Sequence, residues 1–188
     1  MGRAGQVITV RAEHERATTA VLTAWQRGAG CWRRVLDPVR AFVGSQGIGR
    51  ASESSARTPA GVWPLTEGFG HLPVRTRLPY REIDAADWWV SDPASPLYNT
   101  YQRCQAGGCP FDESAGEALG RSGAVYDHAV VIDYNRSPVV PGAGSAFFLH
   151  VTGGGPTAGC VAIPVAELRT LLDWLDPSEH PVIDIAVR

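Results

Sequence analysis

The stretch FFLHVTGGGPTAGCVAIP, residues 147–164, decides how this chain folds and where its chemistry lies. Its apolar beginning has the composition of a buried strand, and that strand carries His150. A glycine-rich turn follows, and Cys160 comes directly before a segment of helical periodicity. The sequence therefore predicts a strand, a turn and a helix, with a His and a Cys on either side of the turn.

This turn contains the residue types that a cysteine nucleophile needs. The thiolate is the reactive form of Cys, and a neighbouring imidazole or a helix N-terminus lowers the pKa of the thiol. Backbone N–H groups of a glycine-rich turn can point at a developing oxyanion, because no Cβ obstructs their approach. His150 and Cys160 are ten positions apart, so the turn can bring them into contact. The pattern fits covalent acyl transfer by a cysteine.

Plainer interpretations of the same residues stay open. Cys160 lies between Gly159 and Val161, which suits a small buried apolar residue, and His150 suits a core histidine on a Phe-rich strand. A metal site made of His128, His150 and Cys160 would lack the usual spacing of metal ligands. We expect neither a metal nor a cofactor.

The rest of the chain has mainly the pattern of β-structure. Short β-branched or alternating segments, separated by Gly, Asp and Pro, predict strands at 7–10, 20–25, 32–43, 88–90, 129–134, 146–151 and 182–187. One helix is predicted after Cys160, with Pro164 in its first turn and an apolar stripe of Leu168, Leu171, Leu172 and Leu175. Residues 44–58 are predicted to form a mobile polar loop, and residues 115–119 one or two helical turns. We find no repeat and no boundary, which predicts one domain over residues 1–188.

Composition excludes several functions. The 188 residues include 17 basic and 19 acidic side chains, a formal net charge of −2, and every basic residue is Arg. Nucleic acids and anionic membranes bind proteins that have an excess of basic residues. This chain has no such excess, so neither is an expected partner. Without lysine there is no Schiff base and no P-loop cation. No apolar run approaches the roughly 18 residues of a membrane helix. Residues 1–30 lack the apolar segment of a signal peptide, so no signal or membrane anchor is visible.

The four cysteines differ in their surroundings. Cys104 and Cys109 lie five positions apart in QRCQAGGCPF, which predicts a small disulfide if the compartment is oxidising. Cys31 has no assigned role, and Cys160 is the candidate nucleophile.

Two ordered motifs resemble the L,D-transpeptidase catalytic domain family, which is YkuD-like. That family has a His on a strand followed by S/T-x-G-C-[IV], and here the positions are His150 and residues 157–161, TAGCV. Its T-P-x-G-x-aromatic feature stands at residues 58–63, TPAGVW. The resemblance is strongest over residues 35–187 and implies a mainly β sandwich or barrel with one helix after the catalytic Cys. Many members carry His where Ala158 stands, and Arg or Asn where Ala162 stands.

The resemblance implies roles for particular residues. Cys160 would be the nucleophile, His150 its base, and the backbone near Gly159 part of an oxyanion hole. The residues expected to contact substrate are Thr157, Ala158, Tyr134 and His128. Turn formation is the alternative for Thr157, an exposed strand edge for His128, and ordinary strand packing for Tyr134 and Tyr126.

The resemblance also implies a reaction. It would join peptidoglycan stem peptides in 3→3 cross-links through a thioester on Cys160, outside the cytoplasm, and a carbapenem β-lactam would acylate the same thiol. Two alternatives remain. One is an L,D-carboxypeptidase that hydrolyses the same stems, and the other is a degenerate cell-wall-binding module, which Ala158 and Ala162 would favour.

Overall fold

The computed structural model describes residues 3–188, and β-strands dominate it. The strands are β1 (Gln6–Ala12), β2 (Thr19–Arg27), β3 (Trp32–Phe42), β4 (Ile48–Gly49), β5 (Thr58–Pro59), β6 (Gly61–Gly70), β7 (Tyr80–Glu82), β8 (Asp87–Trp89), β9 (Tyr101–Arg103), β10 (Glu117–Ala118), β11 (Ala129–Ile132), β12 (Phe148–Val151), β13 (Val161–Ile163) and β14 (Val182–Val187). The helices are α1 (Val165–Trp174) and the short 3-10 helices η1 (Leu119–Arg121), η2 (Gly123–Tyr126) and η3 (Pro177–Glu179). The predicted fold class, mainly β with one helix after Cys160, is confirmed.

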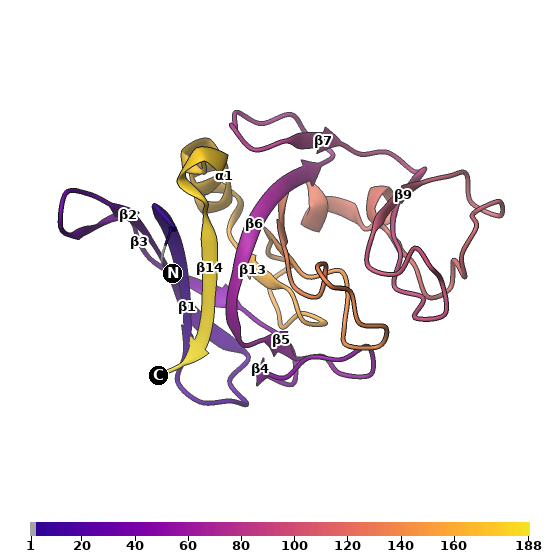
Figure 1. Cartoon of the computed structure of the whole chain (residues 1–188), viewed down its shortest axis with the longest axis horizontal. Helices are drawn as coiled ribbons and strands as arrows, with labels where there is room; N and C mark the ends of the chain where they lie inside the picture. Colours follow the sequence, from indigo (N-terminus) through magenta and orange to yellow (C-terminus); the bar gives the residue numbers. More distant parts are fainter. Residues whose placement is uncertain (1–2) are drawn as a thin grey trace.

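The main sheet closes on itself. Its strand order is β11-β12-β13-β3-β2-β1-β14-β6-β7, and β6 also pairs with β11. The sheet is therefore a closed barrel. The short strand β7 pairs in parallel with the C-terminal part of β6. Figure 1 shows β14 lying beside the long, curved β6. Closure satisfies the backbone groups that a free sheet edge would leave unpaired.

The helix α1 covers one end of the barrel, at the top of Figure 1. Its buried residues Leu168, Leu171 and Leu172 follow the spacing that places side chains on one face. Pro164 precedes the first turn, where its missing N–H costs no hydrogen bond. These leucines join the apolar residues of the barrel strands in one core, so the helix is held by packing.

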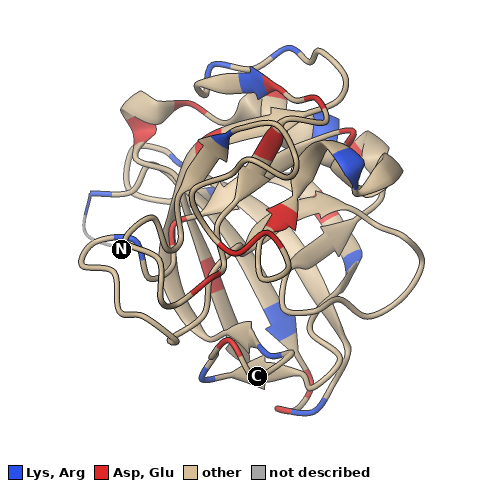
Figure 2. Cartoon of the chain, turned by 90° about the vertical axis from the view of Figure 1, so that its right-hand side faces the viewer, with Lys and Arg blue, Asp and Glu red and all other residues tan. Residues whose placement is uncertain are grey.

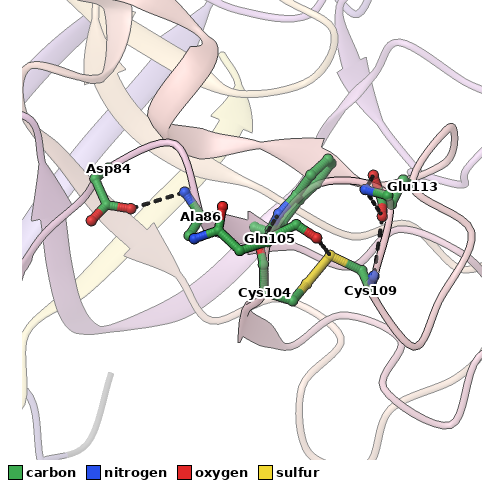
Figure 3. Close-up of a disulfide and its surroundings, with 8 residues drawn as sticks. Asp84, Ala86, Cys104, Gln105, Cys109 and Glu113 are labelled. Carbon is green, nitrogen blue, oxygen red and sulfur yellow. Dashed lines mark hydrogen bonds between the residues drawn. A yellow bond between two sulfur atoms is a disulfide. The ribbon is translucent and has the colours of Figure 1, made fainter.

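A small lobe extends from the barrel between β7 and β11. There β8 pairs with both β9 and β10, in the order β10-β8-β9. Figure 1 shows β9 at the end of the molecule opposite the β2–β3 hairpin. Cys104 and Cys109 form a disulfide in this lobe, as the sequence predicts, and Figure 3 shows Glu113 beside it. The Glu113 carboxylate accepts hydrogen bonds from the N–H groups of Gly107 and Cys109, which fixes the loop that the disulfide closes.

Three local predictions need correction. Residues 115–119 form no helical turn over their length: Glu117 and Ala118 form β10, because they pair with β8. Residues 44–58 contain β4, which pairs with β5, and Ile48 is buried, so the segment has ordered structure of its own. Cys160 is followed by β13, and α1 begins only at Val165.

Acidic and basic residues are interspersed over the side of the molecule seen in Figure 2. Several form ion pairs, such as Arg103 with Asp84 and Arg136 with Glu67. None of the described helices has the length and apolar character needed to cross a membrane.

Candidate active site

Cys160 is positioned by two neighbouring strands. β12 and β13 run parallel, with His150 opposite Ala162, so Cys160 enters β13 level with the beginning of β12. The Cys160 Sγ accepts a hydrogen bond from the N–H of Phe148 at 3.3 Å and donates to the carbonyl of Ala146 at 3.4 Å. The thiol is thus held by the backbone of the strand that carries His150.

His150 lies on the same strand, and one of its ring nitrogens is fixed. Its Nδ1 is 2.8 Å from the carbonyl oxygen of Val151, so Nδ1 carries the proton and donates to this oxygen. Nε2 is then the unprotonated nitrogen of the neutral ring. The orienting group is thus a backbone carbonyl at the end of β12, within the range 151–155 in which such a carbonyl is expected from the sequence.

Burial keeps both reactive groups uncharged. It raises the pKa of the Cys160 thiol, and the nearby carboxylate of Glu117 raises it further. Burial also lowers the pKa of His150 below its ordinary value of 6.5, against a smaller opposite effect of the hydrogen bond to Val151. The resting site therefore holds a neutral thiol and a neutral imidazole at one cavity, so a proton would have to leave the thiol before the sulfur could act as a nucleophile. The helix N-terminus expected to lower the pKa of the thiol is not adjacent to it.

Two threonine hydroxyls fix the peptide group of Cys160. Thr157 Oγ1 donates to the Cys160 carbonyl at 2.7 Å and accepts from the N–H of Gly159 at 3.1 Å. Thr58 Oγ1 donates to the same carbonyl at 3.3 Å and accepts from the N–H of Gly44 at 2.8 Å. Thr157 therefore acts as the turn-forming hydroxyl, and Thr58 ties the T-P-x-G segment to the catalytic turn.

Of the N–H groups of Gly159 and Cys160, these bonds leave that of Cys160 for an oxyanion. The N–H of Gly159 is occupied by Thr157, whereas the N–H of Cys160 donates to no other described residue. Gly159 has a φ of +147°, and a Cβ there would lie 2.6 Å from the ring of Phe147. Glycine is thus required at this position by the close packing of the turn against Phe147.

A cavity of about 760 Å³ opens over the thiol. Its lining includes Cys160 and His150, which keep 9% and 8% of their surface exposed, so both can be reached from it. Thr157, Ala158 and Gly159 also line this cavity, together with Tyr126. The structure therefore brings together most of the residues that the sequence analysis singled out.

Two predicted substrate contacts lie elsewhere. His128 is buried, its Nδ1 is 3.1 Å from the hydroxyl of Tyr80, and it does not line the cavity over Cys160. The alternative interpretation, an exposed His128 at a strand edge, is wrong because the side chain is buried. Tyr134 lies in the turn after β11 and donates to the Ala143 carbonyl at 2.9 Å, and its ring packs edge-on against Phe147. Both residues support the structure around the site from outside it.

Sequence reasoning missed Glu117, which lines the cavity and accepts a hydrogen bond from the hydroxyl of Tyr126. No spacing in the sequence links Glu117 with Cys160, because the lobe brings them together through tertiary packing. No group of three or more described His, Cys, Asp or Glu side chains is arranged to hold a metal ion.

A closed barrel that holds a thiol, a neutral imidazole and an unoccupied backbone N–H at one cavity has the groups of a cysteine-dependent acyl-transfer site. The family model of the YkuD L,D-transpeptidase catalytic domain matches residues 7–183, and the chain belongs to this family. Membership supports L,D-transpeptidase-type activity on peptidoglycan. No curated protein and no solved structure matches the chain.

Proposed function

We propose that this protein is an L,D-transpeptidase that forms 3→3 cross-links between peptidoglycan stem peptides through a thioester on Cys160, outside the cytoplasm. The observation that carries the proposal is that Cys160 and His150, held by adjacent strands, line the same cavity. The family provides the substrate class.

The acylation step begins with a proton transfer. The thiol, which donates to Ala146 O in the structure, turns toward His150, and Nε2 takes its proton. The Cys160 sulfur attacks the carbonyl that follows the L-centre of the diamino acid in a stem tetrapeptide. The N–H of Cys160 stabilises the oxyanion, and removing one such donor typically costs about 3–4 kcal/mol. His150 then gives the proton to the departing D-Ala.

The second step releases the thioester. An amine of a second stem attacks the acyl carbon and forms the cross-link, while attack by water would give the carboxypeptidase product. The two outcomes share the acyl-enzyme and differ only in the acceptor.

A carbapenem tests the acyl-enzyme directly. We expect intact-mass analysis to show one adduct on the wild-type protein and none on Cys160→Ser, with peptide mapping assigning it to Cys160. Cys31→Ser is the matched control, because Cys31 is the other free cysteine and is exposed away from the cavity. This control should keep the adduct.

Product masses from a stem tetrapeptide test the reaction itself. A dimer that forms only when an amine acceptor is present supports transpeptidation, and a trimmed stem alone supports the carboxypeptidase. The proposal fails if Cys160 takes no adduct and if His150→Ala leaves turnover unchanged. Equal stem binding by wild type and Cys160→Ala, without turnover by either, would indicate the degenerate binding module.

A further inference from the structure

The charged side chains that line the cavity over Cys160 are all acidic. They are Glu53 and Glu117; no Arg is among the described lining residues, and the chain contains no Lys. Glu53 is exposed, whereas Glu117 lies deeper, against Tyr126. His150 is neutral and offers no compensating charge. A cavity with this lining attracts a cationic group of a ligand and repels an anionic one.

Glu117 is held beside the reacting groups by one aromatic ring. It belongs to β10, and its Oε1 accepts a hydrogen bond from the hydroxyl of Tyr126. The Tyr126 ring packs edge-on against the imidazole of His150, with centroids 5.4 Å apart. The side chain of Tyr126 thus contacts both the carboxylate of Glu117 and the imidazole of His150, the proposed base.

The second carboxylate oxygen of Glu117 has no partner among the described residues and is not completely buried. Within residues 3–188, Oε2 of Glu117 accepts no hydrogen bond, and the side chain forms no ion pair. Part of the Oε2 surface is accessible to solvent, and the residue lines the cavity. A donor group of a ligand can approach this oxygen from the cavity.

The charge on this carboxylate is coupled to the state of the sulfur. Burial raises the pKa of Glu117, and the carboxylate of Glu117 raises the pKa of Cys160. The site therefore disfavours a thiolate and a carboxylate together. The resting thiol and a thioester both leave the sulfur neutral, so neither repels the carboxylate.

We propose that Glu117, oriented by Tyr126, binds the ammonium group of the acyl acceptor and takes one of its protons, so that the acyl-enzyme selects an amine over water. The inference rests on the thioester of the proposed function. It gives the cavity a specificity-determining residue on the acceptor side of the reaction.

The step balances in atoms and charge. The acceptor arrives as an ammonium with three protons, and one of them moves to the carboxylate of Glu117. The amine nitrogen forms a C–N bond to the acyl carbon, and the C–S bond to Cys160 breaks. The second proton goes to the departing sulfur, which regenerates the thiol, and the third stays on the new amide. Glu117 then releases its proton to solvent in the cavity.

The test separates the two halves of the reaction in Glu117→Gln. The donor is a stem tetrapeptide, and the acceptor is a stem tripeptide with one free side-chain amine. We expect thioester formation, followed as D-Ala release in the absence of acceptor, to change much less than transfer to the amine. The acceptor KM should rise roughly ten- to hundredfold, as expected for a lost hydrogen bond to a charged group. The share of hydrolysed product should increase.

Two further variants interpret this result. Glu82→Gln removes the same charge from an exposed position on β7 and should leave the acceptor KM and the product ratio unchanged. Glu117→Asp keeps a carboxylate and should recover part of the acceptor affinity. An acceptor tripeptide acetylated on its amine should not change the rate of hydrolysis in any variant.

Each other outcome overturns the inference. An unchanged acceptor KM and product ratio in Glu117→Gln would show that the carboxylate does not bind the amine. An equal slowing of thioester formation and of transfer would show that Glu117 only supports the structure. A wild-type protein that forms no thioester would overturn the proposed function itself, and this inference with it.

Discussion

His150 and Cys160 meet in a site where burial disfavours charge on both, and this determines how activity should depend on pH. The imidazole accepts the thiol proton only when it is neutral, and burial lowers its pKa below 6.5. Acylation should therefore be lost as the pH falls, and the midpoint of this loss should lie below pH 6.5. Because the pKa of Cys160 is raised, no second loss is expected on the alkaline side of neutrality.

The rate of carbapenem adduct formation, followed by mass across the acid and neutral range, measures this dependence. A preformed thiolate–imidazolium pair would instead stay reactive at acid pH and lose activity on the alkaline side, where the imidazolium loses its proton. That result would contradict the neutral pair described here.

At the residue scale, the sequence could predict which thiol and imidazole lie at one cavity, but not their protonation. Cys160 and His150 stand in a recognisable turn, so their pairing is predictable from spacing and residue type. The pKa of each depends on burial by Phe148 and its neighbours, which only the folded barrel provides. Glu117 could not be predicted, because its contact with Tyr126 joins a lobe to the barrel.

At the scale of elements, the β4–β5 pair is tied to the catalytic turn through the hydroxyl of Thr58. We expect Thr58→Val to destabilise the protein by about 1–3 kcal/mol, because the buried N–H of Gly44 loses its acceptor. The acylation rate should also fall, since the carbonyl of Cys160 loses one of two hydroxyl donors. Denaturant unfolding and carbapenem adduct formation measure the two effects.

Thr170→Val is the matched control for this substitution. Thr170 is exposed on α1, and its hydroxyl bonds only to the carbonyl of Ala166 one turn earlier. Its replacement should change the free energy of unfolding by no more than about 0.5 kcal/mol. Equal stability of the two variants would show that Thr58 does not hold the turn.

The strands with clear patterns are those that the sequence predicts. Residues 182–187 are predicted as a strand and coincide with β14, where β-branched residues pair with both β1 and β6. The strand β6 (Gly61–Gly70) was missed, because its Pro64 and three glycines are unusual in a strand. The helical turns predicted at 115–119 were wrong, because pairing with β8 outweighs local preference there.

At the scale of the whole molecule, the barrel depends on close contact where β6 meets β11 and β7. A Cβ on Gly70 would lie 2.2 Å from the backbone oxygen of Asp127 and 2.3 Å from the hydroxyl of Tyr80. Gly70→Ala should therefore push β6 away from Asp127 and Tyr80. This should cost about 1–3 kcal/mol of unfolding free energy, the range found for overpacked sites.

Gly28→Ala provides the comparison. Its Cβ would meet only the carbonyl oxygen of Cys31, at 3.5 Å, which is an ordinary contact. Thermal and denaturant unfolding of the two variants should differ clearly, with Gly28→Ala close to wild type. A Gly70→Ala protein as stable as Gly28→Ala would mean that β6 can move away from its neighbours without loss of stability.

Closure of the barrel could not be derived from the strand pattern alone. The pairing of β1 with β14 joins the two ends of the chain, and periodicity in sequence gives no information on which strands are neighbours. The resemblance of residues 147–164 to a known signature implied a sandwich or barrel, and tertiary pairing decides between them.

The burial of Cys160 has a consequence for the survival of the protein. Oxidants such as peroxide attack the thiolate, so a thiol that burial keeps protonated is oxidised slowly. Cys31, in contrast, is exposed at the β2–β3 hairpin, where oxidation can link two chains. Conditions oxidising enough to close the Cys104–Cys109 bridge would therefore spare the Cys160 thiol. The burial that keeps the Cys160 thiol protonated therefore also protects its sulfur from oxidation.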